Sequence, residues 1–138
     1  MSERTGSAES NRAFMGDYFR VMSADGDITA FFTEDVTWVN VESGQQFRGR
    51  AAVRDYIRAL HDRLYEARSQ GRSLDVTDAH AFLEGDFVGT STDVRVPFCL
   101  VYDLGDAGIS AMRAYMSFGS LPVRVPEAAG EPVPEHLG

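Results

Sequence analysis

The chain has 138 residues, a mass of 15.2 kDa and 43% hydrophobic residues, which suits one compact domain and leaves no room for a second core. Its 21 acidic and 13 basic side chains give a formal charge of -8, which repels phosphate backbones and disfavours nucleic-acid binding. No apolar run is long enough to cross a bilayer, no hydrophobic signal stretch opens the sequence, and Cys99 has no second cysteine to pair with. These features predict a cytoplasmic protein with no nucleic-acid or membrane partner.

Two short helices are expected near the start of the domain. Residues 1–10 are small and polar without any period, and we expect them to be disordered. Apolar side chains recur at helical spacing over residues 14–22, a polar run at 24–27 interrupts them, and the pattern resumes over 28–32.

A strand and a longer helix are expected next. Residues 36–41 are β-branched and aromatic and run into Glu42-Ser43-Gly44, which predicts a strand that ends in a turn. From Gly49 to Leu64 the apolar residues follow the i, i+3, i+4 pattern, which predicts a helix whose apolar face includes His61.

The rest of the domain is expected to be a curved antiparallel meander. From Leu74 the period falls toward two, and Glu84-Gly85-Asp86 is expected to form the turn that follows. Further strands are expected over residues 87–95, 98–104 and 109–119. Residues 122–138 are rich in proline and glutamate and are expected to form a flexible tail, so the ordered domain spans 11–121.

Both alternating faces of the last two expected strands are largely apolar. Phe98, Leu100 and Tyr102 oppose Cys99 and Val101, and Met112, Ala114 and Met116 oppose Ala111 and Tyr115. Helices can cover only one of these faces, and the simplest cover for the other in so small a domain is a second copy of the chain. We therefore expect a homodimer packed sheet to sheet.

Three stretches, in this order and at this separation, resemble the nuclear transport factor 2-like superfamily. They are Gly26-Asp27-Ile28 leading to Phe32-Thr33-Glu34-Asp35-Val36-Thr37-Trp38, then Gly49-Arg50-Ala51-Ala52-Val53, and finally Gly108-Ile109 leading to Arg113-Ala114-Tyr115. The resemblance implies an α+β fold of the cystatin-like type, in which a curved, mostly antiparallel sheet wraps around N-terminal helices to form a cone. The superfamily includes ketosteroid isomerase, SnoaL-like polyketide cyclases, limonene epoxide hydrolase and the SgcJ/EcaC family.

The catalytic residues of two of these relatives are not matched. The resemblance places Asn40 where ketosteroid isomerase has its aspartate base, and an amide does not carry a proton at neutral pH. The second carboxylate of that enzyme falls on or near Cys99, and its tyrosine near Tyr18 or Phe19. The carboxylates and arginine of limonene epoxide hydrolase fall near Val94, Ala114 and Thr92. The resemblance to the SgcJ/EcaC family is local but closer, because Trp38, Asn40, Gly49 and His61 stand much as that group's Trp, Asn, Gly and His do.

Trp38, Asn40 and His61 are the first candidates for a site. Trp38 and Asn40 share one face of their strand, and His61 lies on the apolar stripe of its helix, so all three converge if both elements line the cone. We expect apolar walls around them from Tyr56, Leu60, Met112, Ala114 and Met116. The alternative is structural: Asn40 fixes the end of a strand and His61 is a satisfied core histidine.

Asp78 and His80 are second candidates, because a carboxylate beside an imidazole can orient a general base. They are expected on the strand face that carries Leu74 and Val76, or else at a strand bend in solvent. No metal is expected, since their spacing with His61 matches no recognised helix motif. Cys99 is also expected among the substrate-binding residues of the wall, although its apolar neighbours favour a quiet core position over a nucleophilic role.

The expected function is that of a cofactor-independent isomerase or cyclase of the SnoaL-like type. It would act on an apolar, oxygenated, polyketide-like molecule in an enclosed cavity, in secondary metabolism such as antibiotic biosynthesis. His61 is the candidate acid or base, with Asp78 and His80 in reserve. Asn40 and Trp38 are expected to position or polarise a carbonyl, and Tyr18 to donate a hydrogen bond. The alternative is a ligand-binding or assembly protein of the same fold without chemistry of its own.

Overall fold

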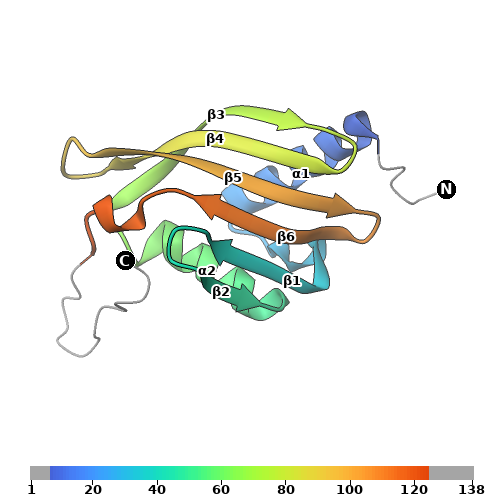
Figure 1. Ribbon diagram of the computed structural model, residues 1–138, viewed down its shortest axis with the longest axis horizontal. Helices are drawn as coiled ribbons and strands as arrows, with labels where there is room; N and C mark the ends of the chain where they lie inside the picture. Colours follow the sequence, from blue (N-terminus) through green and yellow to red (C-terminus); the bar gives the residue numbers. More distant parts are fainter. Residues whose placement is uncertain (1–6, 125–138) are drawn as a thin grey trace.

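The computed structural model describes residues 7–124, which form helices and a single curved sheet. The sheet has six strands in the order β2-β1-β6-β5-β4-β3. Only the contact between β1 and β6 is parallel, and every other neighbouring pair is antiparallel. In chain order the elements are α1 (Ala8–Ser23), η1 (Ile28–Phe31), β1 (Phe32–Asn40), β2 (Gln45–Arg48), α2 (Arg50–Asp62), β3 (Ala67–Val76), β4 (His80–Gly89), β5 (Arg95–Gly105), β6 (Gly108–Tyr115) and η2 (Phe118–Ser120) (Figure 1).

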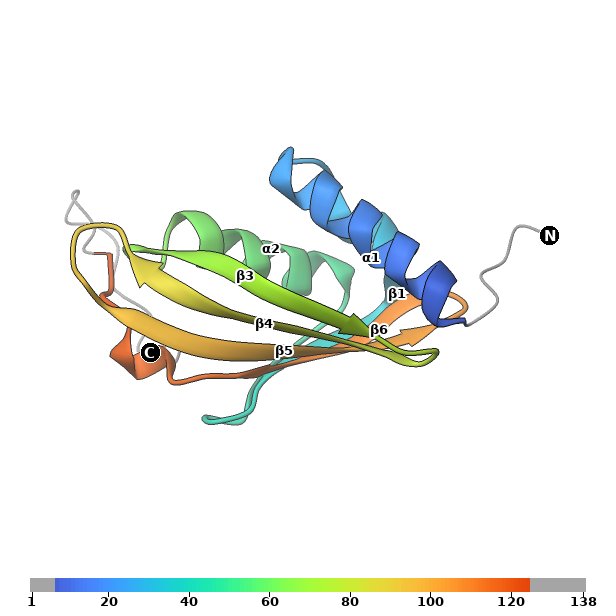
Figure 2. The same ribbon diagram turned by 90° about the horizontal axis from the view of Figure 1, so that it is seen from above.

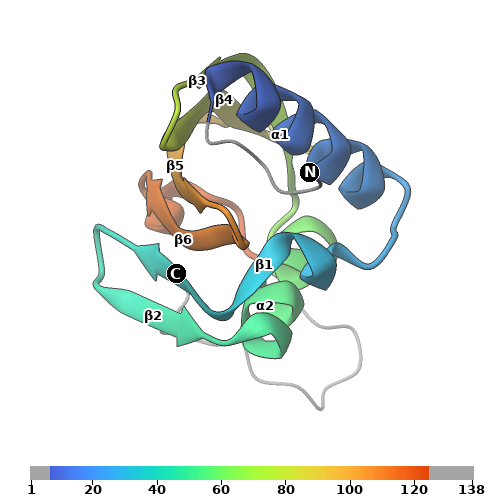
Figure 3. The same cartoon turned by 90° about the vertical axis from the view of Figure 1, so that its right-hand side faces the viewer.

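Both long helices lie against the same face of the sheet. Figure 2 shows α1 and α2 on one side of the sheet and neither of them on the opposite face of β3 to β6. The end-on view shows the sheet curling around the space below α1 (Figure 3). The expected α+β fold, a curved and mostly antiparallel sheet around N-terminal helices, is confirmed.

Local chemistry explains where each helix begins. The hydroxyl of Ser7 accepts a hydrogen bond from the backbone N–H of Ser10 at 3.0 Å and caps α1. Residues 8–10, which were expected to be disordered, are therefore helical. Gly49 precedes α2 with a φ of 96°, a left-handed conformation that favours glycine.

The first residues of the expected tail pair with the chain that follows α2. Of the expected tail, residues 122–124 are described, and Val123 forms a β-bridge with Tyr65. The backbone N–H of Arg124 also donates to the carbonyl oxygen of Leu64 at 2.9 Å. The remaining parts of the expected disordered ends, residues 1–6 and 125–138, lie outside the described residues.

The expected turn at Glu84-Gly85-Asp86 is wrong, because these residues lie in the middle of β4. The chain instead turns at residues 77–79, where the hydroxyl of Thr77 accepts from the backbone N–H groups of Ala79 and His80 at 3.1 and 2.9 Å. Strand β2 was not expected, and the stretch expected as a strand over 87–95 contains the turn between β4 and β5.

Candidate functional site

A cavity of about 840 Å³ lies between the helices and the concave face of the sheet. Its walls come from α1, α2, η2 and five of the strands, and they are mostly apolar and aromatic. The apolar residues of this wall include Leu60, Leu83, Phe87, Phe98, Leu100 and Phe118. A volume of this size accommodates a molecule with several rings or a folded chain.

Two buried tyrosines stand side by side in the cavity wall. Tyr18 lies on the inward face of α1 and Tyr102 on the inward face of β5, each is 1% exposed, and their ring centroids are 6.1 Å apart in an edge-to-face arrangement. Neither hydroxyl has a hydrogen-bond partner within residues 7–124. Burial raises the pKa of Tyr18, and burial together with the neighbouring Tyr18 raises the pKa of Tyr102. Both side chains are therefore neutral hydrogen-bond donors at physiological pH.

Polar side chains line the cavity where it opens to solvent. His61, in the last turn of α2, and Ser23, at the end of α1, are both exposed. Ser69 joins them from β3, where it pairs with the inward-facing Phe87, whereas the preceding Arg68 pairs with Val88 and alternates to the outer face. Among the described residues no aspartate or glutamate lines the cavity. Of the lining side chains, the imidazole of His61 is the type that exchanges a proton near neutral pH.

Asn40 holds other residues in place from behind the cavity wall. It is 2% exposed and does not line the cavity, whereas its neighbour Trp38 does. The Asn40 carbonyl oxygen accepts from Trp38 Nε1 at 2.7 Å, and its amide nitrogen donates to the Tyr56 hydroxyl at 2.9 Å and to Gln45 Oε1 at 3.1 Å. Its polar atoms are thus occupied in fixing Trp38 and Tyr56.

The expected wall residues divide between cavity and core. Leu60, Ala114 and Met116 line the cavity. Met112 is fully buried in the core, and Tyr56 stacks on Phe47 with ring centroids 4.1 Å apart. Neither Met112 nor Tyr56 lines the cavity.

Cys99 lies on the other side of the sheet. It faces outward from β5 and is half-buried, and its side chain does not line the cavity. Burial, reinforced by the nearby Glu84, raises the pKa of its thiol. A thiol in such surroundings stays protonated and is a poor nucleophile.

Asp78 and His80 also lie away from the cavity. Asp78 is exposed in the turn before β4, and His80 points to the outer face, where its Nε2 is 3.4 Å from Asp103 Oδ1. Asp103 in turn accepts two hydrogen bonds from Arg113, at 2.8 and 2.9 Å. The register differs from the expected one because β4 starts at His80, so that Ala81 faces inward. No cluster of three or more His, Cys, Asp or Glu side chains suited to a metal occurs in the part of the chain that the structure describes.

Tyr18 was expected among the site residues, whereas Tyr102, which also lines the cavity, was not. The signal for Tyr102 was the alternation that puts it on one face with Phe98 and Leu100, both of which line the cavity. The alternation does not predict that α1 packs over this face and brings Tyr18 against it.

Comparison with known proteins agrees with this architecture. The model of the SnoaL-like domain family matches residues 11–112, and the chain belongs to that family. No curated protein sequence matches it. No described helix is long and apolar enough to cross a membrane.

Several solved structures share the fold at low sequence identity. A candidate ketosteroid isomerase from Kribbella flavida is 19% identical, with 94% of each chain covered and a TM-score of 0.66. SalBIII, an epoxide hydrolase/cyclase-like enzyme with a role in pyran ring formation in the polyether salinomycin, is 19% identical over 87% of this chain and 100% of its own, with a TM-score of 0.64. A candidate SnoaL-like polyketide cyclase from Shewanella denitrificans is 9% identical over 79% of this chain and 91% of its own, with a TM-score of 0.62.

Proposed function

We propose that this protein is a cofactor-independent enzyme that isomerises or cyclises an apolar, oxygenated, polyketide-like molecule within the cavity, as part of secondary metabolism such as antibiotic biosynthesis. The observation that carries the proposal is the pair formed by Tyr18 and Tyr102. Two buried hydroxyl donors without a partner among the described residues, in the wall of an apolar cavity, suit the oxygen of a ligand carbonyl. Membership of the SnoaL-like family supports the same class of reaction.

The proposed chemistry divides between the tyrosine pair and His61, all three of which line the cavity. Tyr18 and Tyr102 donate to the carbonyl oxygen and stabilise the negative charge that develops there as an enolate forms. His61 takes the proton from the carbon beside the carbonyl. Return of this proton to a more distant carbon completes an isomerisation. Attack of the enolate carbon on a second carbonyl of the same molecule, with the proton delivered to the new alkoxide, completes a cyclisation.

The apolar walls contribute by selecting a conformation. A flexible chain reacts with itself only when its reacting carbons meet, and a shaped apolar cavity holds it in that arrangement. Trp38 is part of this wall, and Asn40 fixes its indole through the 2.7 Å hydrogen bond. In this proposal Asn40 is a positioning residue, because its amide is directed to Trp38, Tyr56 and Gln45.

Turnover can be tested without knowing the natural substrate. Isomerisation and ring closure by carbon–carbon bond formation both leave the molecular mass unchanged. We would incubate the protein with β,γ-unsaturated ketones and with polyketide-derived methyl esters, and search by chromatography and mass spectrometry for new products of the same mass. Loss of one oxyanion donor typically costs about 10²-fold in rate or more, so Tyr18→Phe and Tyr102→Phe are each expected to reduce turnover by about that factor.

Substitutions at the proposed base complete the test. His61→Ala is expected to lower turnover, and Asn40→Ala is expected to lower it through loss of the Trp38 position. If both variants keep full activity, this assignment of the site is wrong. Asp78→Asn and His80→Ala examine the reserve candidates, and a loss seen there but not in His61→Ala would place the reaction outside this cavity.

A ligand-binding protein without chemistry is the second candidate function. No carboxylate among the described residues lines the cavity, and the resemblance places the amide of Asn40 where ketosteroid isomerase has its aspartate base; both points favour it. Saturable binding of the same panel without any new product, unchanged in His61→Ala, would support this alternative.

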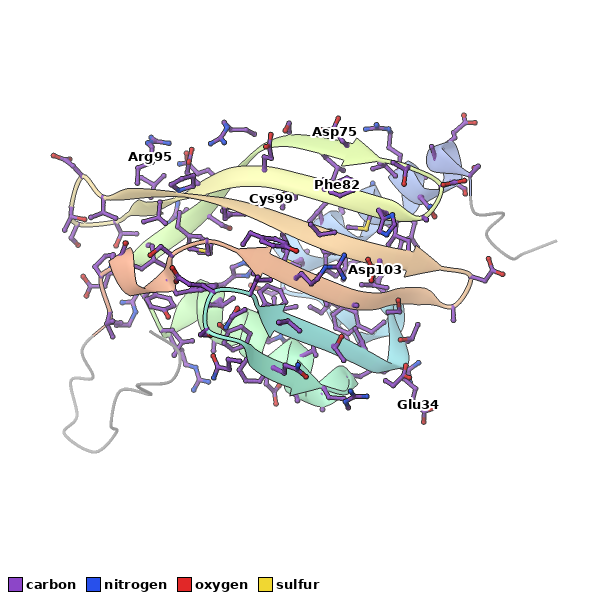
Figure 4. The ribbon with its side chains drawn as sticks, in the orientation of Figure 1. Glu34, Asp75, Phe82, Arg95, Cys99 and Asp103 are labelled. Carbon is purple, nitrogen blue, oxygen red and sulfur yellow. The ribbon has the colours of Figure 1, made fainter. Side chains whose placement is uncertain are left out.

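We also propose that the protein acts in the cytoplasm as a homodimer joined through the outer face of the sheet. The helices leave that face uncovered (Figure 2). Figure 4 looks onto it and shows Phe82 and Cys99 on β4 and β5. Tyr115, on the same face of β6, is 45% exposed. A second copy of the chain is the simplest cover for these apolar side chains.

A further inference from the structure

Arginines gather at one end of the outer face of the sheet, near the turn between β4 and β5. They are Arg68 and Arg72 on β3 and Arg95 on β5, and all three are exposed. Arg68 points outward because it pairs with Val88, which lies on the same face of β4 as Asp86. Arg72 and Arg95 share a single carboxylate, that of Asp86. Three guanidinium groups and one carboxylate on these strands make this end of the face basic.

Carboxylates gather at the opposite end of the same face, near the β3–β4 and β5–β6 turns. Asp75 on β3 pairs with Phe82, and Asp103 on β5 pairs with His80, so both carboxylates point outward. Asp75 is exposed and has no ion pair with a described residue, whereas Asp103 is bound by Arg113. Two carboxylates against one guanidinium make this end acidic while His80 is neutral.

The basic and acidic ends share one midline. Arg95 and Asp103 are eight residues apart on β5, which corresponds to roughly 26 Å of extended strand, and Cys99 lies halfway between them (Figure 4). Arg68 and Asp75 are seven residues apart on β3, and their midpoint lies in the bulge of that strand, beside the row of paired residues that contains Cys99. Rotation of one copy by 180° about an axis along this row therefore exchanges the basic and acidic ends of both strands.

We infer that two copies of the chain pack outer face to outer face with their strands in opposite directions, so that the basic end of each copy covers the acidic end of the other. This inference rests on the proposed homodimer, since it names how the two copies are oriented. Arg95 of one copy then lies over Asp103 of the other. A twofold axis along the strands would instead bring Arg95 over its own counterpart, where like charges repel. Opposed ends also offset the repulsion between two chains that each carry a formal charge of -8.

Arg95→Gln, Asp103→Asn and the variant with both substitutions form a cycle that detects contact between the copies. The dissociation constant of the dimer is measured for each by analytical ultracentrifugation at low and high salt. Within one chain the two side chains are too far apart for their substitutions to be coupled, so coupling between them arises only across the interface. Arg12→Gln and Asp25→Asn remove the same charges from exposed positions in and after α1, and are the control pair.

A second cycle guards against local damage to the sheet. Arg95→Gln leaves Asp86 bound to Arg72 alone, and Asp103→Asn removes the carboxylate that holds Arg113. Arg68→Gln and Asp75→Asn on β3 disturb no ion pair with a described residue, and they are expected to show the same coupling. Circular dichroism of every variant checks that it is folded.

Each single substitution is expected to weaken the dimer about two- to twentyfold, because it removes two symmetry-related exposed ion pairs. The double variant is expected to dissociate no more readily than the weaker of the two single variants, since either substitution already removes the contact. The control pair is expected to leave the dissociation constant unchanged. Added salt is expected to weaken the unmodified dimer and to have little effect on the double variant.

Contrary results separate the orientation of the copies from the dimer itself. If the unmodified protein is a dimer and neither cycle shows coupling, because the substitutions change nothing or weaken the dimer additively, the inferred orientation is overturned and the proposed dimer stands. If the unmodified protein is a monomer at all concentrations, the inference and the proposed dimer are both overturned. The proposed reaction in the cavity is on the other face of the sheet and is unaffected by either result.

Discussion

Among the single residues, Tyr18 and Tyr102 each carry a buried hydroxyl that lowers the stability of the fold, and packing alone does not explain why. A buried hydroxyl without a partner costs about 1–3 kcal/mol, and phenylalanine would fill the same space without that cost. Tyr56 shows the contrast, since its hydroxyl accepts a hydrogen bond from the Asn40 amide at 2.9 Å. Unpartnered donors beside a cavity are what a binding site for a carbonyl oxygen requires before its ligand arrives.

The first prediction compares these tyrosines by stability. Tyr18→Phe and Tyr102→Phe are expected to leave the free energy of unfolding unchanged or to raise it by up to about 1 kcal/mol, because each removes an unsatisfied hydroxyl. Tyr56→Phe is the control and is expected to lower it by about 1 kcal/mol, because the Asn40 amide loses an acceptor. Urea unfolding followed by Trp38 fluorescence measures all three. A loss in Tyr18→Phe as large as that in Tyr56→Phe would show that its hydroxyl is satisfied after all.

Strand alternation predicts which side chains share a face, but not which of them reach the cavity. Alternation along one strand placed Trp38 and Asn40 on the same face, and the structure joins them by a hydrogen bond. Whether such a residue meets the cavity or stands behind its wall depends on neighbours from β2 and α2, here Gln45 and Tyr56. A linear pattern contains no information about these neighbours.

At the scale of elements, strands β3, β4 and β5 are tied together on the outer face by one carboxylate. Asp86 of β4 accepts from Arg72 of β3, and from Arg95 of β5 at 3.0 Å. The hydrogen bond with Arg72, followed by that with Arg95, lowers the pKa of Asp86 below its ordinary value of 3.8. These three strands curve around the cavity, so the contact helps to hold its shape.

The second prediction follows from this shift in the Asp86 pKa. Because the pKa is lower in the folded protein, the contribution of Asp86 to stability is present above about pH 3.8 and is lost as the pH falls through the lower folded value. Asp86→Asn is thus expected to be less stable than the unmodified protein at pH 7, with the difference shrinking below about pH 4. Denaturant unfolding across this pH range measures it. Asp106→Asn, in the exposed β5–β6 turn, is the control, and an equal pH dependence there would contradict the assignment.

Gly85 shows why one turn was misplaced from sequence. Glycine between two acidic residues is typical of a turn, but here the glycine allows β3 and β4 to approach each other closely. A Cβ atom at this position would lie 2.2 Å from the carbonyl oxygen of Gln70 and 2.9 Å from Gly71 Cα. Glycine suits both a turn and a close contact between strands, and only the position of the neighbouring strand distinguishes the two cases.

The third prediction tests this close approach. Gly85→Ala is expected to lower the free energy of unfolding by about 1–3 kcal/mol, because the contact is with backbone that must shift. Gly105→Ala is the matched control, since a Cβ atom there meets nothing within 4 Å. Thermal unfolding of both variants is the measurement, and equal melting temperatures would show that β3 moves aside without cost.

The two faces of the sheet differ across the molecule in what covers them. The helices close the concave face over the cavity, while the outer face carries Phe82, Val101 and Tyr115 between its charged groups. On this outer face, His80 and Arg113 surround Asp103 and lower its pKa, Arg113 having the larger effect. The sequence alone predicts that both faces of β5 and β6 are apolar. The positions of α1 and α2 determine which of the two faces lines the cavity.

The fourth prediction concerns the outer face. If two copies pack through it, Tyr115→Glu places a carboxylate in an apolar interface, where desolvation without a partner is costly. The unmodified protein is then expected to sediment as a dimer and Tyr115→Glu as a monomer, with the variant retaining its circular dichroism spectrum because Tyr115 is 45% exposed in the single chain. Ala52→Glu adds the same charge on the exposed side of α2 and is expected to remain dimeric. Sedimentation of the unmodified protein as a monomer at all concentrations would show that the outer face is left to solvent or to a different partner.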